Sequence, residues 1–180
     1  MERHIGQKVR RGGGRTKGPA KRTKKDNEKF EATFNKLLGD EVIEIRYVTK
    51  SDEPFWFTLD EHLSKAEFDL KIRDKRGYVI CIDEKPIGVM RYNLIWDNTP
   101  FLTLIYIDEA QHGNGYGRQA MLFWENDMRS LGYRMVITST QVNEEAQHFY
   151  RKLGYVERGG IFLDNTPFEQ PQEMFMIKVL

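Results

Sequence analysis

The sequence has one cysteine, no long apolar run and no apolar segment behind its charged N-terminus, and each absence excludes a class of protein. Cys81 by itself cannot form an intrachain disulfide, which favours a reducing compartment. No run approaches the roughly 20 apolar residues of a membrane-spanning helix, and a secretory signal peptide needs an apolar stretch near its start. The sequence therefore predicts a soluble, cytoplasmic protein without membrane contact.

The net charge of +1 conceals two regions of opposite charge. Residues 1–28 contain ten Lys or Arg against three Asp or Glu, whereas the rest of the chain contains 18 against 24. The first region has too few apolar side chains to fold alone, and it lacks aromatic side chains that stack on bases. We expect a disordered basic tail over residues 1–28. Weak contact with nucleic acid, a solvated extension and an added leader all stay open for it.

Hydrophobic spacing predicts the elements of the remaining body, residues 29–180, which we expect to form one domain. Phe30, Phe34 and Leu37 recur at helical spacing and predict a connecting helix over residues 29–40. A capping box at Ser64-Lys-Ala-Glu67 marks the start of a later helix. The predicted elements of this half are strands at 42–49, 77–83, 87–96 and 101–107, and helices at about 52–63 and 65–75.

The second half predicts a change of topology. A strand at 101–107, a helix that ends near Gly132 and a strand at 135–140 follow in succession, which indicates one right-handed parallel crossover. A further helix with Asn143 as its N-cap and two closing strands, at 155–163 and 173–180, complete the chain. The predicted fold class is α+β, with a mixed, mostly antiparallel sheet, one parallel β-α-β crossover and flanking helices.

Three alternating glycines lie between the strand at 101–107 and the helix that follows it. Glycine takes positive φ without strain, and the N-terminus of a helix attracts anions, so His112-Gly-Asn-Gly-Tyr-Gly117 suits a phosphate. A Walker A loop would need Lys and Ser or Thr where Arg118 and Gln119 stand. A dinucleotide site would need an acid in the next strand, and residues 134–140 contain none.

The same stretch resembles the [Q/R]-x-x-G-x-[G/A] pyrophosphate loop of the GNAT superfamily of acyl-CoA-dependent N-acetyltransferases. Asn143-Glu-Glu-Ala-Gln-His-Phe-Tyr-Arg-Lys-Leu-Gly-Tyr155 resembles that family's N-x-x-A-x-x-F-Y-x-x-x-G-[FY] segment. The resemblance covers about residues 42–180 and implies the GNAT fold, with direct transfer of acetyl from acetyl-CoA to a primary amine of a small molecule or peptide, without a metal. One departure is His112, where the family has Gln or Arg; Gln111 lies one place early.

The resemblance also implies roles for individual residues. The backbone of the strand end would hold pantetheine and the loop would hold pyrophosphate, while Asn143 would contact the cofactor or act only as an N-cap. The Tyr150 hydroxyl would protonate the departing thiolate. The expected cofactor-binding residues are Tyr106, Ile107, His112, Gly113, Asn114, Gly115, Tyr116, Gly117, Arg118 and Asn143.

An amine acceptor also needs a base, because a pKa near 10.4 keeps it mostly protonated at neutral pH. The strand at 101–107 contains no acid, so we expect Glu109 just after it to be the base, with Glu44, Asp60 and Glu61 as open alternatives. Acidic residues between 164 and 173 suit a cationic acceptor. Three alternatives also stay open: a non-catalytic acyl-CoA sensor, a ribosome- or nucleic-acid-associated factor that acts through residues 1–28, and a homodimer.

Overall fold

The computed structural model describes residues 43–180, where seven strands form one mixed sheet in the order β1-β2-β3-β4-β5-β7-β6. The expected basic tail and connecting helix lie outside the described residues. The strands are β1 Glu44–Tyr47, β2 Gly77–Ile82, β3 Lys85–Ile95, β4 Thr99–Ile107, β5 Met135–Gln141, β6 Val156–Ile161 and β7 Glu173–Val179. The helices are α2 Glu53–Leu59, α3 Lys65–Arg73, α4 Tyr116–Ser130 and α5 Ala146–Lys152, with 3-10 turns η1 Lys50–Asp52 and η2 Glu109–Gln111.

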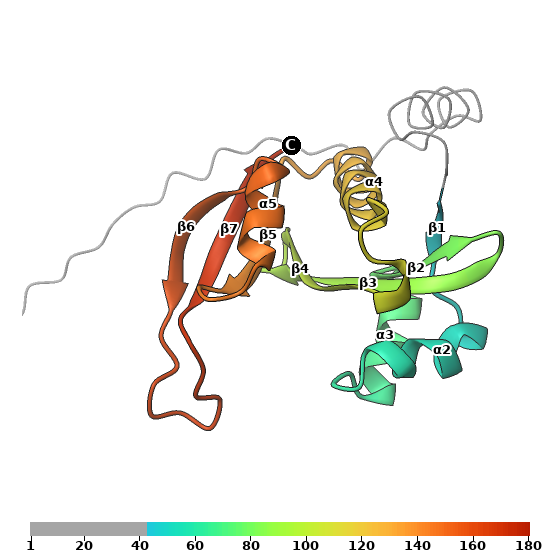
Figure 1. The fold of residues 1–180 in the computed structure, drawn as a ribbon, viewed down its shortest axis with the longest axis horizontal. Coiled ribbons are helices and arrows are strands. Elements are labelled where there is room, and N and C mark those ends of the chain that lie inside the picture. Colours follow the sequence, from blue (N-terminus) through green and yellow to red (C-terminus); the bar gives the residue numbers. More distant parts are fainter. Residues whose placement is uncertain (1–42) are drawn as a thin grey trace, which may run out of the picture.

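The predicted fold class is confirmed. β1 to β4 form an antiparallel meander, β4 and β5 are the parallel pair, and α4 is the crossover between them. The chain closes with antiparallel β7 between β5 and β6. Figure 1 shows α4 and α5 on one side of the sheet, with α2 and α3 on the other. Among residues 43–180, no helix is long and apolar enough to span a membrane.

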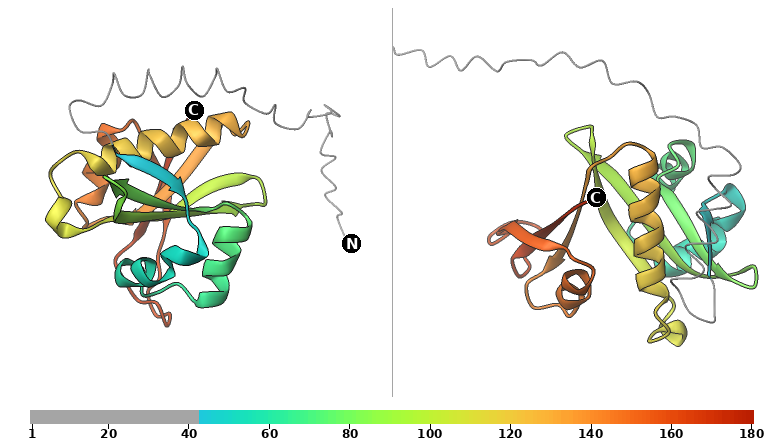
Figure 2. Two further views of the ribbon diagram at one scale, coloured as in Figure 1. Left: turned by 90° about the vertical axis from the view of Figure 1, so that its right-hand side faces the viewer. Right: turned by 90° about the horizontal axis from the view of Figure 1, so that it is seen from above.

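The two faces of the sheet bury separate clusters. Met121, Trp124 and Met128 share one face of α4 and are fully buried against strand residues such as Tyr92. On the other face, Trp56 of α2 packs with Phe68 of α3 in a separate cluster of the core. Burial of each large apolar side chain contributes roughly 1.5–3 kcal/mol to folding. Figure 2 shows that α4 lies across several strands. Its packing on the sheet therefore fixes the orientation of its N-terminus relative to the strands.

Helix α2 ends at Leu59, about four residues earlier than predicted. Asp60 leaves the helical region (φ −127°, ψ 76°), and its carboxylate accepts hydrogen bonds from the side chains of Arg91 and Trp56. One of the two hydrogen bonds of the predicted capping box is present: the Ser64 side chain accepts from the Glu67 amide (3.2 Å). Helix α3 begins at the next residue, Lys65. A long-range ion pair therefore ends the first helix, and a local cap starts the second.

Helix α5 begins at Ala146, and the predicted N-cap role of Asn143 is wrong. The Glu144 carboxylate accepts hydrogen bonds from the Thr140 hydroxyl (2.6 Å) and from the Gln141 amide (3.2 Å). These bonds hold the chain in a turn at the end of β5. The helix therefore starts two residues later than the Asn143 signal indicates, at Ala146 instead of Glu144.

Candidate functional site

The sheet splits between its two parallel strands. β4 and β5 pair only at Phe101 with Ile137 and at Leu102 with Thr138, although both strands continue beyond these positions. The split divides the sheet into an N-terminal arm, β1 to β4, and a C-terminal arm, β5 to β7. Figure 1 shows the two arms diverging, with α5 beside one and α4 above the other. The facing strand edges therefore do not pair with each other beyond residues 102 and 138.

A β-bulge lies where the split begins. Arg91 pairs with Leu104 and Tyr92 with Leu102, so Thr103 is an extra residue in β4. The bulge reverses the alternation of side chains: Leu102 and Ile105, three residues apart, both pack toward α4, whereas Leu104 packs with the α2 and α3 cluster. A bulge also bends its strand, which explains why β4 leaves β5 after residue 102.

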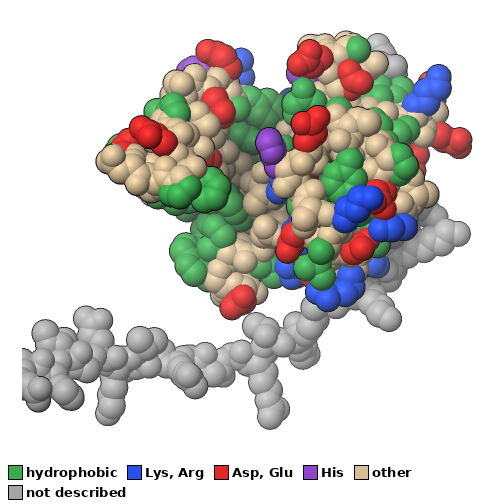
Figure 3. All heavy atoms as spheres, turned by 90° about the horizontal axis from the view of Figure 1, so that it is seen from below, with side chains coloured by type: hydrophobic (Ala, Val, Ile, Leu, Met, Phe, Trp, Pro, Cys, Tyr) green, Lys and Arg blue, Asp and Glu red, His purple; other side chains and the backbone are tan. Residues whose placement is uncertain are grey.

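A pocket of about 770 Å³ opens at the split. Strand β4, the loop after it, the start of α4 and one face of α5 contribute its wall. Nine of the expected site residues line it: Tyr106, Ile107, His112, Gly113, Gly115, Tyr116, Gly117, Arg118 and Tyr150. Figure 3, in which the molecule of Figure 1 is seen from below, shows a hollow between the two lobes of the molecule, with acidic side chains around it.

The glycine loop has the geometry of an anion cradle. Gly113 (φ 83°) and Gly115 (φ 79°) take left-handed conformations, and Gly115 is the N-cap of α4. The first intrahelical bond runs from the Gln119 amide to the Gly115 carbonyl (3.1 Å), so the amides of Gly117 and Arg118 have no acceptor within the helix. An anionic phosphate would receive these N–H groups at the positive end of the helix dipole.

The third glycine is less constrained than the first two. Gly117 has no positive φ, and a Cβ there would lie 3.7 Å from Phe149 Cζ, an ordinary contact. Gly115 needs glycine because its backbone is left-handed. This difference gives a physical reason for the loop pattern [Q/R]-x-x-G-x-[G/A], which requires Gly at the position of Gly115 and accepts Gly or Ala at the position of Gly117.

His112 closes the turn between β4 and the loop. Its Nε2 lies 2.7 Å from the Ile107 carbonyl oxygen, which can only accept, so Nε2 donates. The ring also meets the Tyr106 ring edge-on, at 6.5 Å between centroids. The residue that departs from the family pattern thus connects the loop to the strand end while it lines the pocket.

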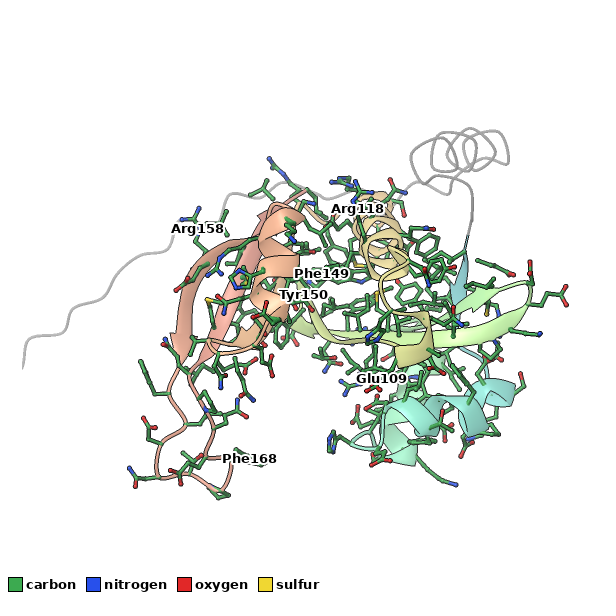
Figure 4. The ribbon with its side chains drawn as sticks, in the orientation of Figure 1. Glu109, Arg118, Phe149, Tyr150, Arg158 and Phe168 are labelled. Carbon is green, nitrogen blue, oxygen red and sulfur yellow. The ribbon has the colours of Figure 1, made fainter. Side chains whose placement is uncertain are left out.

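Tyr150 lies in the pocket wall with 7% of its surface exposed. Burial raises the pKa of its hydroxyl, and a hydrogen bond with the Thr138 side chain partly opposes that rise. Thr138 is the last β5 residue that pairs with β4. Figure 4 shows Tyr150 and Phe149 on α5, beside the gap between the arms. The phenol is therefore protonated at neutral pH and lies close to the split.

Three expected site residues are not in the pocket wall. Asn114 donates its side-chain amide to the Gln111 carbonyl (3.2 Å) and stabilises the loop from outside. Glu109 is exposed in η2, and Asn143 is exposed in the turn before α5. Figure 4 shows Glu109 on the side of the gap opposite Tyr150.

The pocket also contains residues that were not expected there. Ala146 and Phe149 share a face of α5 with Tyr150, but they were not among the expected site residues. Their letters in the resembling segment, A-x-x-F-Y, were the available signal. The additional wall residues are Ile105, Gln111, Glu145, Ala146, Phe149 and Lys152.

Fold and pocket together define an α+β protein with a split mixed sheet and an anion cradle at the opening. A model of the acetyltransferase (GNAT) family matches residues 40–155, which is more than half of the chain. The chain therefore belongs to the GNAT acetyltransferase family, and the resemblance read from the two motifs is confirmed.

Two curated relatives match different parts of the chain. The uncharacterized N-acetyltransferase YbbJ of Bacillus subtilis is 28% identical over 126 residues, which cover 62% of this chain and 76% of the relative. A UPF0178 protein of Exiguobacterium sibiricum is 54% identical over 40 residues, which cover 22% of this chain and only 28% of that relative. Residues 1–40 also match a model of the uncharacterized YaiI/YqxD family. The two family matches meet at residue 40.

Solved structures share the fold at low sequence identity. Ard1 from Thermoplasma volcanium is 16% identical with a TM-score of 0.67, covering 77% of this chain and 97% of that one. Arabidopsis thaliana Naa50, in complex with the bisubstrate analogue CoA-Ac-MVNAL, is 13% identical with a TM-score of 0.64, covering 77% and 99%. A GNAT acetyltransferase from Elizabethkingia anophelis with acetyl-CoA bound is 19% identical with a TM-score of 0.62, covering 77% and 98%.

Proposed function

We propose that this chain transfers acetyl from acetyl-CoA to a primary amine of a small molecule or peptide, directly within a ternary complex. One observation supports this most: the open end of the split joins a phosphate cradle to a buried phenol in a single pocket. A molecule with phosphates at one end and a reactive thioester at the other, joined by a long arm, would suit such a pocket.

The proposed cosubstrate site follows the pocket from its loop to the split. Backbone N–H groups between Gly113 and Arg118 would bind pyrophosphate, and the exposed edge of β4 at Tyr106 and Ile107 would hydrogen-bond the pantetheine arm. The left-handed glycines and the amides of Gly117 and Arg118, which have no acceptor within α4, support the first contact. Beyond residue 102, the edge of β4 that faces β5 does not pair with that strand, which supports the second contact.

The chemistry would need two proton transfers. A neutral amine attacks the thioester carbonyl, so a C–N bond forms and the C–S bond breaks. Tyr150 donates its proton to the departing sulfur, while a base removes one from the attacking nitrogen. Acetylated amine and CoA thiol are released, and the base and Tyr150 return to their initial states by proton exchange with solvent. Because burial raises the pKa of Tyr150, its acid form persists across the neutral range.

Glu109 remains the proposed base, acting through water because it lies outside the pocket wall. Asp60, one of the alternatives, is 2% exposed and forms an ion pair with Arg91. That pairing leaves it poorly suited to accept a proton from a substrate. Glu44 and Glu61 are exposed and stay as alternatives.

A cationic amine is the proposed acceptor class. The loop between β6 and β7 contains exposed Asp164 and Glu169, and Glu173 begins β7. Negative charge there would attract an ammonium group before it loses its proton. A peptide N-terminus or a lysine side chain would both meet this requirement, and the Naa50 structure holds an analogue with a peptide portion.

The test is a binding and turnover experiment with the full chain. Calorimetry with acetyl-CoA should give saturable binding, and a panel of amines and short peptides should release CoA thiol. Tyr150→Phe should lower kcat about a hundredfold, the lower range for general acid catalysis, without changing acetyl-CoA affinity more than about twofold.

Tyr155→Phe is the matched control for this substitution. Tyr155 is buried and packs edge-on against Tyr150 (5.6 Å between ring centroids), but it does not line the pocket. Its variant should keep wild-type turnover. Full turnover in Tyr150→Phe would remove Tyr150 from the chemistry, and no acetyl-CoA binding by the wild type would reject the proposed function.

A further inference from the structure

The bulge at Thr103 is fastened by hydrogen bonds to a single residue of the neighbouring strand. The Thr103 hydroxyl donates to the Arg91 backbone carbonyl (3.2 Å) and accepts from Arg91 Nη1 (2.8 Å). Arg91 pairs with Leu104, the residue after the bulge. Both the backbone and the side chain of Arg91 therefore fix the extra residue of β4.

Arg91 is fixed in turn by Asp60, the residue that ends α2. Arg91 Nε donates to Asp60 Oδ2 (2.7 Å) and Arg91 Nη2 to Oδ1 (3.3 Å). Trp56 Nε1 donates to the same carboxylate (3.2 Å), and Trp56 is fully buried. A continuous chain of hydrogen bonds thus runs from the core of α2 to the bulge.

Burial makes this chain of contacts stiff. The Asp60 side chain is 1% exposed and that of Arg91 is 15% exposed. A buried ion pair that loses one partner leaves an uncompensated charge, so alternative side-chain positions are costly. The guanidinium fork is planar and satisfies both carboxylate oxygens at once, which also restricts its orientation.

We propose that Asp60, Arg91 and Thr103 are positioning residues that set the bend of β4 and so the width of the split between β4 and β5. None of the three lines the pocket. Their role rests on the proposed function, because the split is the part of the pocket that would receive the pantetheine arm. Loosening them should weaken acetyl-CoA binding while the groups that carry out the chemistry remain.

The sharpest test compares Thr103→Val with Thr103→Ser. Valine keeps the β-branched shape and removes the hydroxyl, whereas serine keeps the hydroxyl. Loss of two hydrogen bonds of modest net strength should raise the acetyl-CoA dissociation constant about tenfold in Thr103→Val. Thr103→Ser should stay within about twofold of wild type, and kcat at saturating acetyl-CoA should change little in both variants.

Asp60→Asn tests the other end of the chain, and Asp52→Asn is its matched control. Arg46 and Asp52 form a second bidentate pair (2.7 and 2.8 Å) between β1 and the start of α2, remote from the split. Asp60→Asn should weaken acetyl-CoA binding and speed amide hydrogen exchange at residues 104–107. Asp52→Asn should lower stability and change neither.

The outcomes separate the two proposals. If the wild type binds acetyl-CoA and both Thr103→Val and Asp60→Asn bind it equally well, the positioning role is overturned and the proposed function stands. If the wild type binds no acetyl-CoA, the proposed function falls and the role in binding falls with it. Hydrogen exchange at residues 104–107 reports the bend of β4 independently of any ligand, and unchanged exchange in both variants would also overturn the role.

Discussion

The two arms of the split sheet are buried to very different depths. In the N-terminal arm, β2 is buried along almost its whole length, with α4 on one face and α2 and α3 on the other. In the C-terminal arm, every residue of the edge strand β6 is exposed, and α5 covers one face. The pocket therefore lies between the N-terminal arm, which has helices on both faces (the thick arm), and the C-terminal arm, which has a helix on one face (the thin arm). We therefore expect the first arm to determine stability and the second to tolerate change, except at the residues that join it to the rest.

The contact between Lys178 and Glu125 should give the largest effect. Lys178 of β7 donates to Glu125 of α4 (2.6 Å), and Glu125 is fully buried. Lys178→Met would leave a buried carboxylate without its cation. It should cost about 3–5 kcal/mol in the free energy of unfolding, measured by urea denaturation, although its site lies in the thin arm.

The double variant Lys178→Met with Glu125→Leu is the control for that prediction. It removes both charges and replaces them with apolar volume, so it should regain most of the lost stability. A loss in the double variant as large as in Lys178→Met alone would mean that packing around β7, and not the ion pair, joins the arms.

Asp52→Asn should give a smaller loss, confined to the thick arm and dependent on pH. The hydrogen bonds from Arg46 lower the pKa of Asp52 from its ordinary 3.8 to about 2. A lowered folded-state pKa adds stability above about pH 4 and loses it as the pH falls from 4 to 2. The wild type should exceed Asp52→Asn by on the order of 2 kcal/mol at pH 6, and the difference should vanish near pH 2. A difference that is constant over this range would show that the charge of Asp52 is not its source.

Gly115→Ala should cost about 1–2 kcal/mol in stability, because only the left-handed backbone opposes the substitution. A Cβ at Gly115 would meet nothing within 4 Å, so steric conflict is absent in the described structure. Gly117→Ala, two residues later, should cost less than half as much. Thermal unfolding compares the two variants, and equal losses would contradict the assignment of the strain to positive φ.

Regular elements of both arms followed from the sequence because their signals are local. The end of α4 near Gly132 and the cap at Ser64 depend on residues a few positions apart, and both predictions are confirmed. The end of α2 was placed too late because Asp60 is held by Arg91, 31 residues away. The start of α5 was placed too early because Glu144 and not Asn143 caps the turn.

The candidate site was predictable where a motif specifies the backbone. The glycine loop and Tyr150 meet in one pocket, as the two motifs together implied. The bulge at Thr103 left no signal in the sequence, since it is a property of the register between β3 and β4. The place of Phe149 in the pocket wall could not be predicted either. One face of the short helix α5 contacts both the core and the split, and helical periodicity identifies that face without showing which of its residues line the pocket.

The smallest predicted effect tests the thin arm as the side that selects the acceptor. Asp164 and Glu169 are exposed in the β6–β7 loop, and the double variant Asp164→Asn with Glu169→Gln removes two negative charges there. It should raise KM for a cationic amine about two- to threefold at low salt, leave kcat unchanged and lose its effect in high salt, because salt screens the field of exposed charges.

Asp97→Asn, in the β3–β4 turn of the other arm, is the matched control and should change nothing, since asparagine tolerates the positive φ of that position (62°). An equal rise of KM in both variants would mean that net charge, and not the C-terminal arm, attracts the acceptor.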